Sequence, residues 1–296
     1  MCCTPGSIRV CACPERGDEC HERPPRPLAL LLGGLLTTAL VLAAALSWLW
    51  TPHAFEAMNL AQRFAPPSAL HWLGTDAYGR DIASQLLVGA RSTLAVGLVA
   101  VGLGLLLGTG LGLLAAARRG WVEQLTLRLA DFSLAFPALL TAILLSAVRG
   151  PGLGNAVLAI ALLNIPIFAR LARASAASVW AQNYVLAARA CGKSRWRITW
   201  EHILPHCAGV LMAQASSQFA LAILAEAALS YLGLGVQAPA PSWGRMLSEA
   251  QSLLYQAPQL ALYPGLAIAL AVLGFQLVGE GLRQLLAPPT QGRSPW

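Results

Sequence analysis

"AARACGKSRWRITWEHILP", residues 187–205, interrupts a chain that is otherwise made mostly of apolar residues. The stretch holds the sole lysine of the sequence, in a Gly192-Lys193-Ser194 triplet that resembles the end of a phosphate-binding loop. Such a loop has the pattern G-x-x-x-x-G-K-[ST] and follows a strand. Here Ala187 stands at the first glycine position, and the residues before the triplet have helical spacing. The triplet therefore predicts no ATP site, and its surroundings must explain the stretch.

The composition around this stretch is that of an integral membrane protein. Of 296 residues, 56% are hydrophobic and only 11% are charged, too few to solvate a globule of this size. About 20 apolar residues of helix are needed to cross a hydrocarbon core of roughly 30 Å. Suitable apolar runs lie at residues 28–50, 93–117, 130–148, 155–172, 207–230 and 259–281. The sequence therefore predicts an all-α, polytopic membrane protein with six transmembrane helices.

The distribution of positive charge predicts the orientation of these helices, because loops rich in arginine and lysine stay cytoplasmic. With the N-terminus inside, most of the 20 Lys and Arg residues fall in cytoplasmic segments. Both termini are therefore predicted to be cytoplasmic. The net charge of +7 then reflects topology, and nucleic-acid binding is not expected. Trp48 and Trp50 close the first run as interfacial tryptophans do, which favours a retained signal anchor over a cleaved signal peptide.

The lengths of the connecting segments predict the domain organisation. A cysteine-rich cytoplasmic tail precedes the transmembrane domain, which has two long external loops and one long cytoplasmic loop before a short C-terminal tail. The corresponding ranges are 1–27 for the first tail, 28–288 for the domain, 51–92 and 231–258 for the external loops, 173–206 for the cytoplasmic loop and 289–296 for the last tail. In the cytoplasmic loop, helical spacing on both sides of Gly192 indicates a helix, a glycine corner and a second short helix ending at Pro205.

Two features inside the apolar runs concern packing and transport. Gly104, Gly108 and Gly112 recur every four residues, a spacing that favours a close helix contact over a pore lining. Glu226 is an acidic residue well inside an apolar run, where charge is costly. Either Glu226 acts in translocation or coupling, or it caps a turn or pairs with an arginine near the outer interface. The sequence leaves these alternatives open.

Two groups of residues resemble metal sites without matching one. His202 and His206 are one helical turn apart beside Glu201, but the H-E-x-x-H pattern places its glutamate between the histidines, and Pro205 interrupts the turn. Capping of a helix end explains these polar residues more simply. Cysteines are concentrated in the first 20 residues, but a cytoplasmic tail is kept reduced and their spacing is that of no zinc module. The sequence therefore predicts no metal site.

Further comparison of the cytoplasmic loop reveals a resemblance. "YVLAARACGKSRWRITWEHILP", from Tyr184, resembles the E-A-A-x-x-x-G…I-x-L-P loop of permease subunits of bacterial ABC importers. The residues that carry the resemblance are Ala187, Ala188, Gly192, Ile198, Leu204 and Pro205. Leu186 stands where the family has glutamate. This difference removes a charge from the surface that couples such permeases to the ATPase, but it does not remove the helix.

Other stretches extend the resemblance over residues 28–288. They are "HWLGTDAYGRDIASQLLVGARSTLAVGL" from His71, "RLADFSLAFPALL" from Arg128, "ALSYLGLGVQAPAPSWGRML" from Ala228 and "YPGLAIALAVLGFQLVGEGLRQLLAP" from Tyr263. They resemble the second permease of dipeptide, oligopeptide and nickel importers. Because several independent motifs occur in the right order, the resemblance is specific.

The resemblance implies a type I ABC importer permease fold in the bacterial cytoplasmic membrane, in contact with lipid. It implies as partners a homologous second permease, two ABC ATPase subunits and an external substrate-binding protein. The ATPase subunits use the ATP, so this chain is expected to bind no cofactor and to be no enzyme. Arg195 and Arg197 either pair with acidic residues of the ATPase or only enforce the positive-inside rule.

The resemblance also implies roles for two sets of residues. The cytoplasmic set, Leu186, Ala187, Ala188, Gly192, Ile198, Leu204 and Pro205, would dock on the ATPase and transmit its motion. The external set, Gly74, Thr75, Asp76, Gly79, Arg80, Asp81, Gly233, Gly235, Trp243 and Gly244, would meet the binding protein or gate the pathway.

Short peptides are the cargo that the resemblance favours, with nickel or a metal chelate as the alternative. A secondary transporter without ATP is the rival from another class, but it would be favoured by charged residues along several spans, and Glu226 is nearly alone. An intramembrane hydrolase would need a nucleophile and base, or a metal pair, within the spans, and the sequence offers none.

Overall fold

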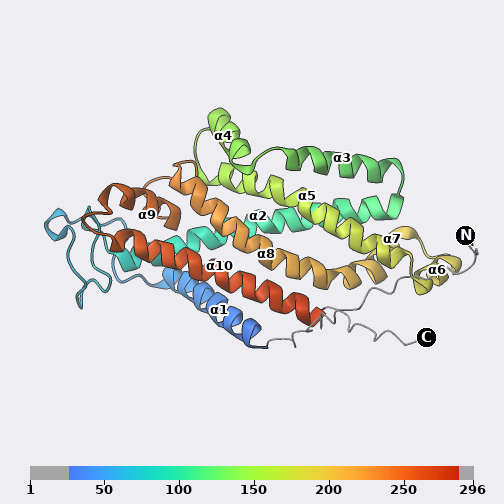
Figure 1. Cartoon of the computed structure of the whole chain (residues 1–296), viewed down its shortest axis with the longest axis horizontal. Coiled ribbons are helices and arrows are strands. Elements are labelled where there is room, and N and C mark those ends of the chain that lie inside the picture. Colours follow the sequence, from blue (N-terminus) through green and yellow to red (C-terminus); the bar gives the residue numbers. More distant parts are fainter. Residues whose placement is uncertain (1–26, 287–296) are drawn as a thin grey trace, which may run out of the picture.

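A computed structural model describes residues 27–286 of the chain, which form helices joined by loops (Figure 1). Within this range no β-strand occurs, and one isolated bridge joins Thr75 to Asp81. The predicted all-α class is confirmed. The predicted tail at 1–27 with its cysteines, and the C-terminal tail at 289–296, lie outside the described residues, apart from Pro27.

Five helices are long and apolar enough to cross a membrane, and a bent pair of shorter helices supplies a sixth crossing if counted as one span. The five are α1 (Pro27–Leu49), α2 (Ile82–Arg118), α5 (Leu153–Trp180), α8 (Leu204–Tyr231) and α10 (Gln259–Leu286). The pair is α3 (Trp121–Ala135) and α4 (Ala138–Arg149), which meet at 84°.

The span that we predicted at 130–148 is bent, because the chain turns between α3 and α4. Pro137 follows the end of α3, and a proline pushes the residue before it out of the helical region. Phe136 accordingly has an extended backbone, with φ −86° and ψ 126°.

The short elements gather at the two ends of the long axis (Figure 1). At one end lie the loop between α1 and α2, with η1 (Leu60–Gln62), and the segment between α8 and α10, with α9 (Trp243–Ala250) and η3 (Gln251–Leu253). At the other end lie α6 (Asn183–Ala190), α7 (Arg195–Ile198) and the π-helical η2 (Thr199–Ile203). These ends correspond to the predicted external and cytoplasmic sides.

Helix α2 begins at Ile82, inside the stretch that we predicted as the external loop 51–92. The Asp81 side chain caps this helix by accepting a hydrogen bond from the Ser84 amide at 2.8 Å. The first turns carry Ser84 and Gln85, which are buried against the loop that precedes α2. The helix therefore extends beyond the apolar run at 93–117 from which it was predicted. The non-helical part of the predicted external segment therefore ends at Asp81.

Helix α2 packs most extensively against α5, through the predicted glycine face. A Cβ added to Gly104 would lie 2.4 Å from Asn164 Cβ, and one added to Gly108 would lie 2.4 Å from the Ile165 carbonyl oxygen. Gly112 approaches the Ala169 carbonyl equally closely. No side chain fits at these distances, so the prediction of a close helix contact is confirmed.

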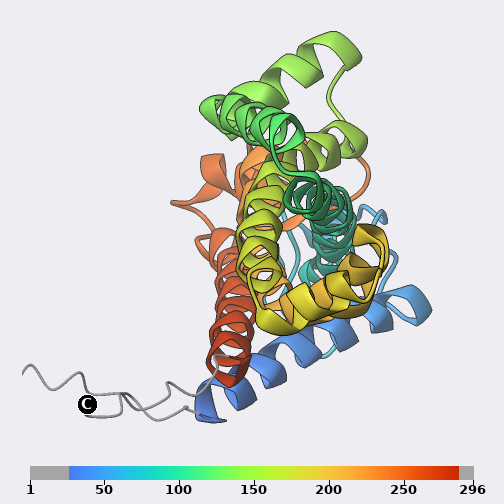
Figure 2. The same cartoon turned by 90° about the vertical axis from the view of Figure 1, so that its right-hand side faces the viewer.

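Helices α1 and α10 run antiparallel, which brings the two ends of the described chain together. Gly33 of α1 lies against Leu277, and Gly281 of α10 lies against Leu30. The start of α1 and the end of α10 therefore lie side by side (Figure 1 and Figure 2), on the side of the molecule toward α6 and α7. This arrangement agrees with the prediction that both termini lie on one side of the membrane.

Candidate functional site

We define the inner loop as residues 181–205. The glycine corner of this loop ends α6 in a Schellman motif. The Gly192 amide donates to the Arg189 carbonyl at 3.0 Å, and the Lys193 amide donates to the Ala188 carbonyl at 3.2 Å. Gly192 has φ +82°, which favours glycine, whereas a Cβ added there would have nothing within 4 Å. The predicted corner is confirmed, but its cause is the backbone angle and not a lack of space.

The other residues of the Gly-Lys-Ser triplet also have structural partners. The Lys193 ammonium lies 2.7 Å from Glu201 Oε2, and the Ser194 hydroxyl caps α7 by accepting from the Arg197 amide at 3.3 Å. A helix, α6, precedes the triplet. A phosphate-binding loop follows a strand, so the triplet lacks the geometry of one.

The chain does not break at Pro205, where we predicted the second short helix to end. Arg195–Tyr231 forms one helical rod, in which α7 passes through the π-helical η2 into α8. Pro205 has no amide hydrogen, and its ring would clash with a carbonyl one α-turn earlier. The wider turn of η2 accommodates this, and Pro205 occupies the first turn of α8. Helix α7 is therefore continuous with a membrane-spanning helix.

One side of the inner loop is anchored in the core and the other is exposed. Val185, Ile198 and Ile203 are fully buried and belong to the core cluster formed with α2, α5 and α8. Leu186 is 48% exposed. Of the other predicted coupling residues, Ala187, Gly192 and Pro205 are exposed, and Ala188 and Leu204 are half-buried.

Contacts inside the chain engage three positive groups of the inner loop, Lys193, Arg195 and Arg197. Arg197 Nε lies 2.5 Å from Glu201 Oε1, and Arg195 Nη1 donates to the Ala117 carbonyl at the end of α2 at 3.2 Å. Hydrogen bonds from Arg197 and Lys193 lower the pKa of Glu201 to about 2, so its carboxylate stays ionised. His202 lies 3.3 Å from Lys193 Nζ and so joins this network, whereas we predicted a capping role.

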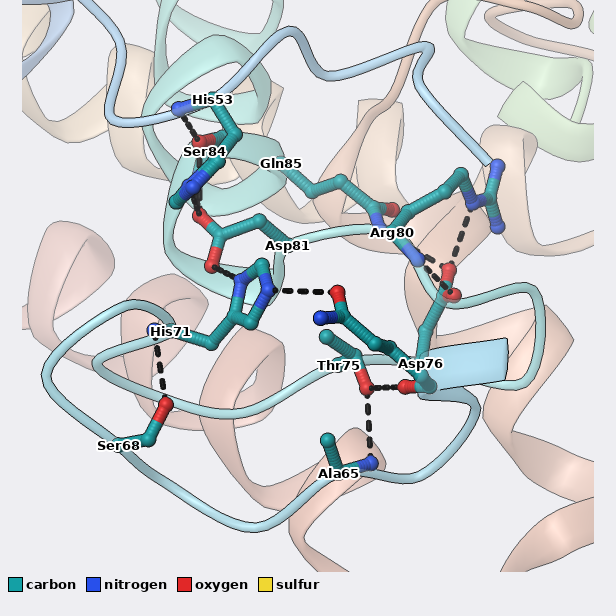
Figure 3. Close-up of polar contacts among 11 residues, drawn as sticks. His53, Ala65, Ser68, His71, Thr75, Asp76, Arg80, Asp81, Ser84 and Gln85 are labelled. Atoms are coloured by element: carbon teal, nitrogen blue, oxygen red, sulfur yellow. Dashed lines mark hydrogen bonds and ion pairs between the residues drawn. The ribbon is translucent and has the colours of Figure 1, made fainter. Parts of the chain in front are cut away.

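At the opposite end, Arg80 joins the two outer loops, which we define as residues 50–81 and 232–258. Its Nε lies 2.6 Å from Asp76 Oδ2, and its Nη2 lies 2.6 Å from Glu249 Oε2 on α9. Gln85 also donates to Asp76 at 3.0 Å (Figure 3). A cavity of about 450 Å³ opens between Asp76 and Glu249, lined also by Tyr78.

The remaining predicted gate residues lie around these contacts. Gly74 and Gly79 form left-handed turns in the first outer loop, and Thr75 donates to the Gln62 carbonyl. In the second, Trp243 donates to the Leu86 carbonyl of α2 at 3.0 Å. The others, Gly233, Gly235 and Gly244, lie at the end of α8 or against it. The structure thus brings the two predicted external groups together.

Glu226 holds the outer ends of α2 and α8 together. It is fully buried, and it accepts hydrogen bonds from Thr93 at 3.0 Å and from Ser230 at 2.7 Å. The Ser230 hydroxyl also accepts from the Val236 amide at 3.2 Å. The alternative of an arginine partner is therefore wrong, and the carboxylate instead supports the turn that follows α8.

Sequence reasoning missed one cluster, which lies where the first outer loop meets α2 (Figure 3). His71 Nδ1 lies 3.0 Å from Asp81 Oδ1, and the His53 ring centroid lies 4.6 Å from that of His71. The histidines are far apart in sequence and follow no ligand spacing, so no local signal pointed to them. Within residues 27–286, His202, His206 and Glu201 form no comparable cluster.

Comparisons with known proteins agree with this architecture. Residues 108–291 match the family described as binding-protein-dependent transport system inner membrane component. The chain is 43% identical to the dipeptide transport system permease protein of Alkalihalophilus pseudofirmus, over 87% of this chain and 85% of that protein. It is 44% identical to a glutathione transport system permease protein of Pectobacterium atrosepticum, over 75% and 74% of the two chains. Identity to the probable D,D-dipeptide transport system permease protein of Escherichia coli is 38%, over 90% and 89%.

A solved structure shares the fold. The chain matches the inward-facing MetNI methionine ABC transporter with a TM-score of 0.57 and 18% identity, over 69% of this chain and 97% of that one. This match supports the predicted type I importer permease fold. The chain belongs to the binding-protein-dependent transport system inner membrane components, a family of multi-pass transport permeases and not of enzymes.

Proposed function

We propose that this chain is a permease subunit of an ABC importer that moves short peptides into the cytoplasm. The observation that carries the proposal is the 43% identity to a dipeptide permease along 87% of the chain. The three relatives named above transport dipeptides or glutathione according to their names, which favours peptides over the nickel alternative. Membership of a binding-protein-dependent family also argues against an ATP-independent secondary transporter.

The inner loop is the surface that docks on an ATPase subunit in this proposal. Its buried side fixes it to the helical core, and its exposed side presents Leu186 and Ala187. Because α7 continues into α8 without a break, a displacement imposed on the loop reaches the membrane-spanning part of α8 as rigid-body motion. This chain then needs no nucleotide site, since two separate ATPase subunits use the ATP.

The outer loops meet the substrate-binding protein on the other side. The Arg80–Glu249 ion pair joins the two loops, so a displacement of one loop would also move the other. A homologous second permease completes the pathway, with the substrate passing between the two subunits. Glu226 couples the outer turn to α2 and α8 from within this chain, and does not itself face the cargo.

The test is transport by the reconstituted complex. The chain is purified with the permease, ATPase subunits and binding protein encoded beside it, and placed in liposomes. We expect ATP-dependent uptake of a radiolabelled dipeptide that needs the binding protein and stops when the ATPase is inactivated. Uptake that continues with an inactive ATPase would overturn the importer assignment. Uptake of Ni²⁺ without uptake of peptides would overturn the cargo.

A further inference from the structure

Two imidazoles and a carboxylate converge where the first outer loop packs on the start of α2. One ligand atom from each of His53, His71 and Asp81 can be chosen so that all three lie within 4.8 Å of one another. The three residues come from the chain just after α1, the middle of the loop and the N-cap of α2 (Figure 3). We propose that they form a binding site for a divalent transition-metal ion, Zn²⁺ in the first place, which pins this outer loop to the membrane domain.

The distances suit a tetrahedral ion after small side-chain movements. His71 Nδ1 lies 3.0 Å from Asp81 Oδ1, and His53 Nδ1 lies 4.0 Å from Asp81 Oδ2. Ligand atoms bonded to Zn²⁺ at about 2.0–2.2 Å stand about 3.4 Å apart in a tetrahedron. The three ligand atoms, which lie within 4.8 Å of one another, therefore need to come closer by up to about 1.4 Å to bind the ion, and a fourth position is left for water.

The environment of His71 favours a cation between its ring and Asp81. Its Nε2 lies 3.2 Å from Gln62 Oε1, and when a neutral ring donates its Nε2 proton there, Nδ1 is left as an acceptor atom. Nδ1 then directs a lone pair at the carboxylate, which is repulsive unless a positive charge lies between them. A metal ion supplies that charge, and Gln62 becomes the outer-shell acceptor that orients a ligating histidine. A ring with its proton on Nδ1 would instead donate a hydrogen bond to Asp81, and the experiment below distinguishes the two.

His53 provides a second, independent indication. Its Nδ1 atom is buried and has no hydrogen-bond partner, although buried polar atoms in proteins nearly always have one. The backbone is nevertheless fixed, because the His53 amide donates to the Ser84 hydroxyl at 3.0 Å. Ligation would satisfy this nitrogen, and the 36% exposure of the side chain gives the ion a route in from solvent.

The donor set selects the class of ion. Two imidazole nitrogens and one carboxylate oxygen suit zinc and related transition metals, whereas Ca²⁺ and Mg²⁺ prefer oxygen ligands alone. Asp81 is held ready, since its Oδ2 accepts from the Ser84 amide at 2.8 Å and from the Ser84 hydroxyl at 2.7 Å. The neighbouring Arg80 is engaged by Asp76 and Glu249 and does not neutralise Asp81.

The experiment measures zinc bound to the full chain in its complex. Thiols of the N-terminal tail would also bind zinc, so the parent for all variants carries serine at Cys2, Cys3, Cys11, Cys13 and Cys20. The complex is equilibrated with Zn²⁺, separated from free metal, and analysed for zinc by mass spectrometry. We expect His53→Ala to lose one equivalent of zinc per chain relative to the parent. His206→Ala, which removes an exposed histidine at the other end of the molecule, should lose none.

A loss of zinc through missing ligands must be distinguished from a loss of zinc through misfolding. His53→Ala removes no side-chain hydrogen bond, so it should fold like the parent. Gln62→Ala keeps all three ligands and should weaken zinc binding by about 10- to 100-fold, as the loss of an outer-shell partner does. Competition by Ca²⁺ or Mg²⁺ should not displace the ion. Equal zinc in the parent and in His53→Ala, including none in either, would refute the site and leave a hydrogen bond from His71 to Asp81 as the explanation of that contact.

Discussion

Nη2 of Arg80 lies 2.6 Å from Oε2 of Glu249, a residue 169 positions further along the chain. Arg80 belongs to the turn that precedes α2, and Glu249 belongs to α9. Asp76 contacts the same guanidinium from the other side, and the Asp76 and Glu249 carboxylates raise the pKa of Arg80 despite its burial, which lowers it. This ion triplet joins the two outer loops, so it is where their relative position is fixed.

Replacing Arg80 by alanine should destabilise the outer side of the protein. Asp76 would remain buried without its cation, and breaking a buried ion pair from one side costs about 3–5 kcal/mol. We expect a lower midpoint of thermal unfolding for the purified complex and faster proteolysis of residues 50–81. Arg63→Ala is the matched control, because Arg63 is an exposed arginine of the same loop. Similar unfolding midpoints for the two variants would contradict the proposed role of the triplet.

The close contact of α2 with α5 gives a second prediction. A Cβ at position 108 would lie 2.4 Å from a backbone oxygen of α5, so Gly108→Ala forces the helices apart. Overpacking of this kind costs about 1–3 kcal/mol. Gly110→Ala is the control on the same helix, since a Cβ there has nothing within 4 Å. We expect the midpoint of thermal unfolding to fall for the first variant and to stay level or rise for the second.

The sequence was sufficient for those parts of the fold that depend on local pattern. Apolar length located the spans, and the repeat of Gly104, Gly108 and Gly112 identified the face of α2 that meets α5. The bend at Pro137 was also visible in principle, because a proline disfavours helix at the residue before it. The prediction treated residues 130–148 as one run because apolar residues continue on both sides of Pro137.

Other parts could not be predicted because they depend on contacts between distant residues. Nothing local indicates that Arg80 meets Glu249, or that the His53 ring lies against that of His71. The uninterrupted helix through Pro205 depends on a π-turn, which has no sequence signature of its own. The start of α2 was missed for a different reason: buried Ser84 and Gln85 look like loop residues in a hydropathy profile, yet they serve the cap and the outer loop.

The corner at Gly192 gives a third prediction, on coupling. A residue with a side chain at φ +82° is strained by about 1–2 kcal/mol, and asparagine tolerates this region better than alanine. We therefore expect Gly192→Ala to transport fewer peptides per ATP hydrolysed, and Gly192→Asn to lie closer to the parent. Since a Cβ here meets no neighbour, neither variant should change the amount of protein in the membrane. Equal transport ratios for alanine and asparagine would show that the backbone angle is not what matters.

The last prediction concerns Leu186, which stands where the resembling permeases carry glutamate. Its side chain is 48% exposed on α6, whereas the adjacent Val185 is fully buried and holds the helix in place. Leu186→Glu should therefore leave thermal stability unchanged, because surface substitutions usually change it by less than about 0.5 kcal/mol. It should alter how tightly the ATPase subunit binds, and an increase in affinity is expected if the partner presents positive charge at this point.

Binding is measured by titrating the purified ATPase onto the permease pair in nanodiscs at low and high salt. Leu186→Gln is the control, since it has the same length as glutamate without the charge. A salt-dependent effect of glutamate alone would show that a charge at this position changes docking, and identical effects of glutamate and glutamine would exclude a charge at this position as the determinant of docking.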